Sequence, residues 1–210
     1  MKKFPTFCVD DFYEYPDEVR EFALQQTFHK MPSCIGLRTS PMKDVQPEFD
    51  DYFNKKLLSM FYDILDPSLQ YIVKNVFHKN YPVESKNYTL YKPEELLWGS
   101  RYGGTFRSDN NAHLDPNNVI SGVIFLNKDE EMHAGVAIYR PVEYSDEHDG
   151  ALLQETARFS QIFNRLVAFD GETWHGRVGD NTREDRLCQV FFVQHVSDQL
   201  SPIEKMRQIV

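Results

Sequence analysis

The sequence predicts a mainly β fold with flanking helices, an α+β arrangement in which N-terminal helices pack on one sheet of a β-sandwich or jelly roll. The first 86 residues contain two stretches whose apolar side chains recur at helical spacing. From Asn87 onward, short runs rich in β-branched and aromatic residues are separated by Gly, Asn, Asp and Pro. Helices that precede a continuous series of short strands are typical of this layered arrangement.

Two helices are expected in the N-terminal part. Residues 16–28 place apolar side chains at helical spacing directly after Pro16, a residue that suits a first helical turn. Residues 48–65 carry the same pattern for longer, and Pro67 ends it. Residues 31–47 contain three prolines and one glycine, which predicts a structured loop between the helices.

The strands are expected in the C-terminal half, and 210 residues suit a single domain. We expect a helical support region over residues 1–86, a β core over 87–196 and a tail over 197–210. Residues 141–164 form one long insertion between strands. Its acidic first part is turn-like and its second part predicts a short helix, so we expect a lid. The expected strands are NYTLY, VISGVIFLN, GVAIYR, RLVAF and RLCQVFFVQHV.

Composition excludes several classes of protein. A formal net charge of −9 disfavours the sequence-independent attraction to phosphates on which nucleic-acid binding depends, although nucleic acid stays open as a substrate. The three cysteines match neither a disulfide framework nor a CxxC zinc site, as expected in a reducing cytosol. No signal-peptide core and no apolar run near the roughly 20 residues of a membrane span is present. We therefore expect a soluble cytoplasmic protein with no membrane partner.

A metal site is predicted from His113, Asp115 and His175. Alternation along a strand puts residues i and i+2 on one face, so His113 and Asp115 can both point into a barrel while Leu114 points away. His175 follows Asp115 by 60 residues, where a turn leads into a new strand. Two imidazoles and one carboxylate on one face of an octahedral ion leave three positions open, which is the arrangement of non-haem Fe(II) oxygenases.

An HxD tripeptide alone is weak evidence in a chain with 7 histidines and 32 acidic residues. Its context strengthens it, because it is the only HxD or HxE in the sequence and directly precedes a predicted strand. Arg186 adds to this, since it lies 11 residues after His175 and opens the last predicted strand. An inward arginine is costly to bury unless a carboxylate meets its planar fork. The alternatives are a surface ion pair of Arg186 with Glu184 or Asp185, and Arg183 as the anchor.

On these motifs, residues 87–196 resemble the 2-oxoglutarate- and Fe(II)-dependent dioxygenases, in which HxD…H is followed by Arg or Lys. The resemblance is closest to the prolyl-hydroxylase-like branch, and VDDFYEYPDEVREFAL is similar to small bacterial and phage members. It implies a double-stranded β-helix (cupin-like jelly roll) that binds Fe(II), 2-oxoglutarate and O₂. It also implies that Arg186 anchors 2-oxoglutarate, with Tyr102 and Cys188 as further contacts.

The implied activity is hydroxylation of an unidentified small-molecule or peptide substrate, with release of succinate and CO₂. Asp115 favours this outcome, because members of the family that halogenate lack the carboxylate. Trp174 is either a packing residue or a substrate contact, and Arg140 either steers an anionic substrate or forms a surface ion pair. The alternatives are a cupin-type isomerase or hydrolase with the same ligands and a non-catalytic jelly-roll binding module. The sequence does not indicate an oligomeric state.

Overall fold

The computed structural model describes residues 5–30, 36–80, 103–104, 112–128, 131–145, 150–178 and 185–196. The predicted strand NYTLY, Tyr102, Cys34 and the predicted tail 197–210 lie outside these described residues.

Both predicted helices are present, and each begins at a proline. These are α1 (Pro16–Leu24) and α3 (Pro47–Met60), with the short α2 (Met42–Val45) just before α3. A proline suits the first turn because the amide it lacks would have no partner inside the helix. Both predicted helices were too long at their C-terminal ends, since the chain leaves α1 before entering strand β2 (His29–Lys30) and turns after α3.

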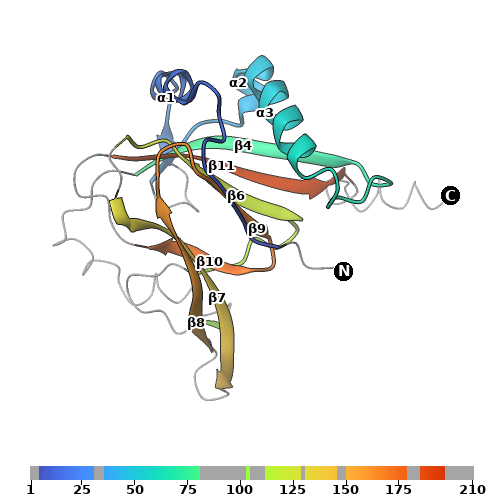
Figure 1. Ribbon diagram of the computed structural model, residues 1–210, viewed down its shortest axis with the longest axis vertical. Helices are drawn as coiled ribbons and strands as arrows, with labels where there is room; N and C mark the ends of the chain where they lie inside the picture. Colours follow the sequence, from blue (N-terminus) through green and yellow to red (C-terminus); the bar gives the residue numbers. More distant parts are fainter. Residues whose placement is uncertain are drawn as a thin grey trace.

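The strands form two sheets, seen one above the other in Figure 1. Among the described residues, all strand pairings are antiparallel except that of β5 with β8. The seven-stranded sheet has the order β1 (Phe7–Val9), β9 (Leu166–Asp170), β6 (Ile120–Phe125), β11 (Arg186–His195), β4 (Tyr71–Asn80), β3 (Leu37–Arg38), β2. The four-stranded sheet has the order β10 (Trp174–Val178), β7 (Glu131–Ser145), β8 (Gly150–Gln161), β5 (Gly103–Gly104).

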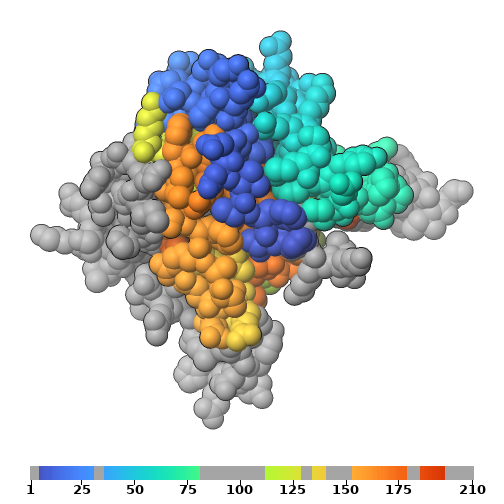
Figure 2. Space-filling model, viewed as in Figure 1, coloured from blue at the N-terminus to red at the C-terminus, as the bar shows by residue number. Residues whose placement is uncertain are grey.

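The helices cover the outer face of the seven-stranded sheet, as the sequence predicts, and lie above β4 and β11 in Figure 1. Phe53 and Leu57 of α3 are fully buried in one cluster with Phe77 of β4 and Phe191 of β11. The N-terminal segment is also part of this sheet, because β1 pairs with β9. Figure 2 shows it (blue) lying against residues of the C-terminal half (orange).

A second apolar cluster fills the space between the two sheets and defines the inside of the jelly roll. It takes alternate residues from each strand, so that neighbours in sequence point out of it. A third, smaller cluster lies on the other face of β10 and β7. The buried members of the second cluster are Val123, Phe125, Val136, Ile138, Val167, Phe169 and Cys188.

Two elements differ from the sequence prediction. The segment 141–164 was wrongly predicted as an insertion with a helix and a lid, because residues 141–145 belong to β7 and residues 150–161 form β8, which pairs with β7; residues 146–149 lie outside the described residues. Strand β4 was not predicted, although it pairs with β11 over ten residues in the middle of the larger sheet. Within the described residues, no helix is long and apolar enough to cross a membrane.

Candidate metal centre

Backbone pairing brings the two histidines of the predicted site together. The amide of His113 donates to the carbonyl of His175 at 2.8 Å, and the amide of His175 donates to the carbonyl of His113 at 3.0 Å. The imidazole centroids lie 4.4 Å apart as a result. The prediction that His113 lies in a regular strand was wrong, because it forms an isolated bridge to β10. Asp115 reaches the same place from the loop that follows.

The loop at Asp115 is held by the turn that precedes β10. The amide of Asp115 donates to the carbonyl of Gly171 at 2.9 Å, and its carbonyl accepts a bond from the amide of Asn118 at 3.3 Å. A side chain at Gly171 would overlap the carbonyl oxygens of Asn118 and Asp115, so only glycine allows this close approach. The predicted turn at residues 170–172 therefore positions one ligand while it leads into the strand of another.

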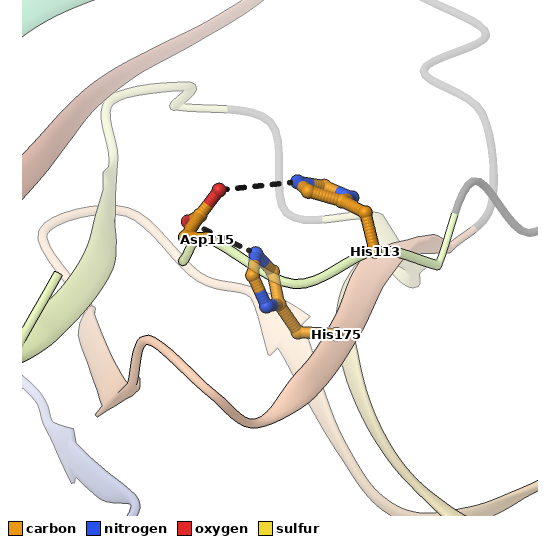
Figure 3. A group of neighbouring side chains, drawn as sticks. All are labelled: His113, Asp115 and His175. Atoms are coloured by element: carbon orange, nitrogen blue, oxygen red, sulfur yellow. Dashed lines mark ion pairs between the residues drawn. The ribbon is translucent and has the colours of Figure 1, made fainter. Parts of the chain in front are cut away.

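The three side chains converge on one point (Figure 3). His175 Nε2 lies 3.3 Å from Asp115 Oδ2, and His113 Nε2 lies 3.7 Å from Asp115 Oδ1. One ligand atom from each residue lies within 4.8 Å of the others. Adjacent ligands of an octahedral ion, each about 2.1 Å from it, are about 3 Å apart. The donor set and its spacing therefore fit a divalent ion with two nitrogen ligands and one oxygen ligand.

The protonation states also suit a metal. His175 Nδ1 lies 2.8 Å from the carbonyl oxygen of Thr173, which can only accept, so this nitrogen carries the proton and Nε2 faces the site. Burial by itself would raise the pKa of Asp115. A hydrogen bond with His175, the charges of His175 and His113 and a hydrogen bond with Ser121 outweigh it and lower that pKa below its usual value. The carboxylate is therefore ionised at neutral pH.

Exposure differs among the three ligands. The side chain of His175 is 8% exposed and that of His113 is 52% exposed. The ring of Phe169, from inside the jelly roll, packs 4.2 Å from the ring of His175. One side of the centre thus faces the apolar interior, and the side of His113 is open to approach.

Arg186 is buried inside the jelly roll. It is 6% exposed, and its guanidinium carbon lies 5.7 Å from the centre of the Phe125 ring. Within the described part of the chain its Nε has no hydrogen-bond partner. The alternative interpretation offers two partners: Asp185 instead pairs with Lys79 at 2.8 Å, and Glu184 lies outside the described residues. Burial lowers the pKa of Arg186, with an opposing effect from Cys188 and a further lowering by the charge of Arg177.

The side chain of Asn127 fixes the backbone on both sides of Arg186. Its Nδ2 donates to the carbonyl of Asp185 at 2.7 Å, and its Oδ1 accepts from the amide of Leu187 at 2.8 Å. Asn127 is 1% exposed, and its bond to Leu187 is buried, whereas its bond to Asp185 is partly buried. Sequence analysis missed this residue, because only the pairing of distant segments shows that Asn127 follows β6 beside the start of β11.

We expect Asn127→Ala to lower the free energy of unfolding by about 2–3 kcal/mol, because it takes the partner of the buried Leu187 amide away and also removes the bond to the Asp185 carbonyl. Urea denaturation of the metal-free protein measures this. A change below about 0.5 kcal/mol, the level of an ordinary surface substitution, would show that the two bonds do not hold the strand.

The other predicted site residues have different surroundings. Cys188 is buried beside Phe125, two residues after Arg186, whereas Cys8 is exposed. Trp174 packs against the cluster on the opposite face of β10 from His175, as a packing residue does. Arg140 is exposed and donates twice to Gln154 Oε1, at 3.1 and 2.8 Å.

Comparison with known proteins shows which solved structures share this architecture. No protein-family model and no curated protein matches the sequence. Among solved structures, the chain is similar to a prolyl-4-hydroxylase from Pseudomonas putida, with a TM-score of 0.53 and 16% identity over 90% of this chain and 91% of that one. The chain is also similar to an oxidoreductase of the 2OG-Fe(II) oxygenase family from Burkholderia pseudomallei. That match has a TM-score of 0.56 and 11% identity over 90% of this chain and 84% of that one. The chain has the fold of these oxygenases. The predicted double-stranded β-helix is therefore confirmed.

A third similar structure carries ligands. HygX from Streptomyces hygroscopicus, with nickel and 2-oxoglutarate bound, gives a TM-score of 0.59 at 9% identity, over 91% of this chain and 83% of that one. At sequence identities this low, the structural similarity shows that the strands are arranged alike and nothing more. The chemistry of this chain has to be argued from its own residues.

Proposed function

We propose that this chain is a 2-oxoglutarate-dependent oxygenase that holds Fe(II) through His113, Asp115 and His175. Two neutral imidazoles and one carboxylate on one side of an ion leave coordination positions for a chelating co-substrate and for O₂. With these bound, Fe(II) supplies the oxidation of an unreactive C–H bond, coupled to conversion of 2-oxoglutarate to succinate and CO₂. The fold shared with HygX and the prolyl-4-hydroxylase supports this proposal.

The observation that carries the proposal is the buried guanidinium of Arg186. A buried cation is costly unless an anion pairs with it, and no hydrogen bond or ion pair to Arg186 is found among the described residues. The distal carboxylate of 2-oxoglutarate matches the planar fork of a guanidinium. Arg186 and Phe169, which touches His175, both belong to the lining of the same interior, so we expect one small dicarboxylate to contact both the metal and Arg186.

The residues of this chain orient and shield the reaction. Thr173 holds the His175 ring through Nδ1, and the turn at Gly171 holds the backbone of Asp115. Phe169 and Phe125 keep water from the inner side of the centre, which strengthens the charge interactions there. The open side at His113 is where we expect the substrate to approach. We propose hydroxylation of a small molecule or peptide in the cytoplasm, since Asp115 retains the carboxylate ligand.

Two other functions use part of the same site. A cupin-type isomerase or hydrolase would need the three ligands but has no use for a buried arginine beside them. A non-catalytic jelly roll would need neither the three metal ligands nor the buried arginine. Arg186 therefore favours a reaction with an organic anion as co-substrate.

The test is an anaerobic titration of the protein with Fe(II) and 2-oxoglutarate. We expect a visible metal-to-ligand charge-transfer band that requires both, and a rise in stability of about 2.7 kcal/mol when the ligand is at 100 times its dissociation constant. A cupin-type hydrolase would bind the metal without the band. Retention of no metal at all would indicate a non-catalytic binding module.

A further inference from the structure

Arg177 is a second arginine on the inner face of the jelly roll. It follows the ligand His175 by two residues on β10, so the two side chains share one face of that strand. Their register partners on β7 are Val136 for Arg177 and Ile138 for His175, and both partners belong to the interior cluster. Trp174 and Val178, the alternate residues of β10, belong instead to the cluster on the opposite face.

Arg186 faces the same interior from the other sheet. Its strand neighbour Cys188 is a register partner of Phe125, and both of these residues are members of the interior cluster. The guanidinium of Arg186 lies over the Phe125 ring. Strands β10 and β11 therefore each direct a guanidinium into the space between the sheets.

The two charges interact. The charge of Arg177 is close enough to contribute to the lowered pKa of Arg186. Two cations that share a buried space repel one another, and the repulsion grows as water is excluded. Arg186 is buried and Arg177 is half-buried, so an anion that binds beside both arginines is attracted by both charges more strongly than at an exposed surface.

We propose that Arg177 is a second cationic contact for the distal carboxylate of the co-substrate and makes the site selective for dicarboxylic 2-oxo acids. The inference rests on the proposed function. Arg177 lies about 6.6 Å along β10 from the metal ligand, so it is on the path of a five-carbon acid that extends from the metal toward Arg186. Arg177 therefore binds the co-substrate, and His113, Asp115 and His175 remain the metal ligands.

The experiment compares two 2-oxo acids on the full chain loaded with Mn(II), which does not turn over. Calorimetry measures the affinity for 2-oxoglutarate and for 2-oxopentanoate, which has the same 2-oxo acid head but a methyl group in place of the distal carboxylate. We expect Arg177→Gln to weaken 2-oxoglutarate binding about tenfold or more, as loss of a charge-assisted hydrogen bond does. Binding of 2-oxopentanoate and of Mn(II) should stay within about twofold.

The control is Arg158→Gln, because Arg158 is an exposed arginine on β8 that pairs with Glu155 and lies between the inward residues Ala157 and Phe159. It should leave both affinities unchanged. Arg177→Lys should bind 2-oxoglutarate more tightly than Arg177→Gln, and Arg177→Met, which keeps an apolar stem, replaces the Gln variant if that one fails to fold. Wild-type affinity of the neutral variant for 2-oxoglutarate would overturn the inference, as would equal losses for both acids. If the wild-type protein binds no 2-oxoglutarate, the proposed function itself is wrong.

Discussion

Asp115→Ala is expected to remove metal binding and with it all consumption of 2-oxoglutarate. Asp115 is the only anionic member of the triad, and both imidazoles are directed at its oxygens. A divalent ion at two neutral nitrogens loses the charge that holds it. Changes to the residues around a metal already cost 10–100-fold in affinity, so loss of a ligand should cost more than about hundredfold. Calorimetry with Mn(II) and an assay for succinate formed without added substrate measure the two effects.

The matched control is Asp51→Ala, because Asp51 is an exposed acid on α3 that pairs only with Lys55 among the described residues. It should bind metal and form succinate as the wild-type protein does. Far-ultraviolet circular dichroism should show that both variants keep the fold, since the backbone bonds at residue 115 do not use its side chain. Wild-type succinate formation by Asp115→Ala would show that another carboxylate is the ligand.

The metal triad was predictable because its signal is local. His113 and Asp115 are two residues apart, and His175 directly follows a turn whose glycine is visible in the sequence. The three residues do converge, but the predicted cause, alternation along one strand, is not what brings His113 and Asp115 together. His113 lies at one isolated bridge and Asp115 lies in a loop, so strand alternation does not align them. Backbone bonds from the turn before β10 perform that role, and the sequence does not show which distant backbone a loop will contact.

The two errors in the predicted fold have different causes. The segment ALLQETARFSQIF contains several good helix formers, yet pairing with β7 makes it a strand, and its inward Ala157 and Phe159 do alternate at strand spacing. Strand β4 has the β-branched and aromatic residues of a strand but follows a helix in the half that was interpreted as helical. Local preference was overridden in the first case, and a local strand signal was passed over in the second.

The residues around Arg186 could not be found from the sequence. Asn127 acts on Arg186 through backbone atoms nearly 60 residues away, as the 2.8 Å bond to Leu187 shows. Arg177 approaches Arg186 only because β10 and β11 belong to opposed sheets. Such relationships depend on strand register, which no spacing within a single segment specifies.

Arg186→Met is expected to change stability and binding in opposite directions. The substitution removes a buried charge for which the described residues offer no counter-ion, and it keeps an unbranched side chain beside Phe125. The free energy of unfolding of the metal-free protein should rise by about 1–3 kcal/mol. The lost cation–π contact between Arg186 and Phe125 reduces this gain. The same variant should show a much weaker charge-transfer band with Fe(II) and 2-oxoglutarate, because Arg177 alone is left to hold the distal carboxylate.

A variant that gains stability while it loses 2-oxoglutarate binding has lost a binding residue and not a structural one. An arginine that supports the fold through its own contacts would destabilise the protein when replaced, and any loss of 2-oxoglutarate binding would follow from that. Urea denaturation without metal and anaerobic titration with both ligands measure the two quantities on one protein preparation. Arg158→Met, which changes an exposed arginine of β8 that pairs with Glu155, is the control and should change neither. A marked loss of stability in Arg186→Met would mean that a protein anion pairs with Arg186, and the strongest support for an organic anion at this site would then be lost.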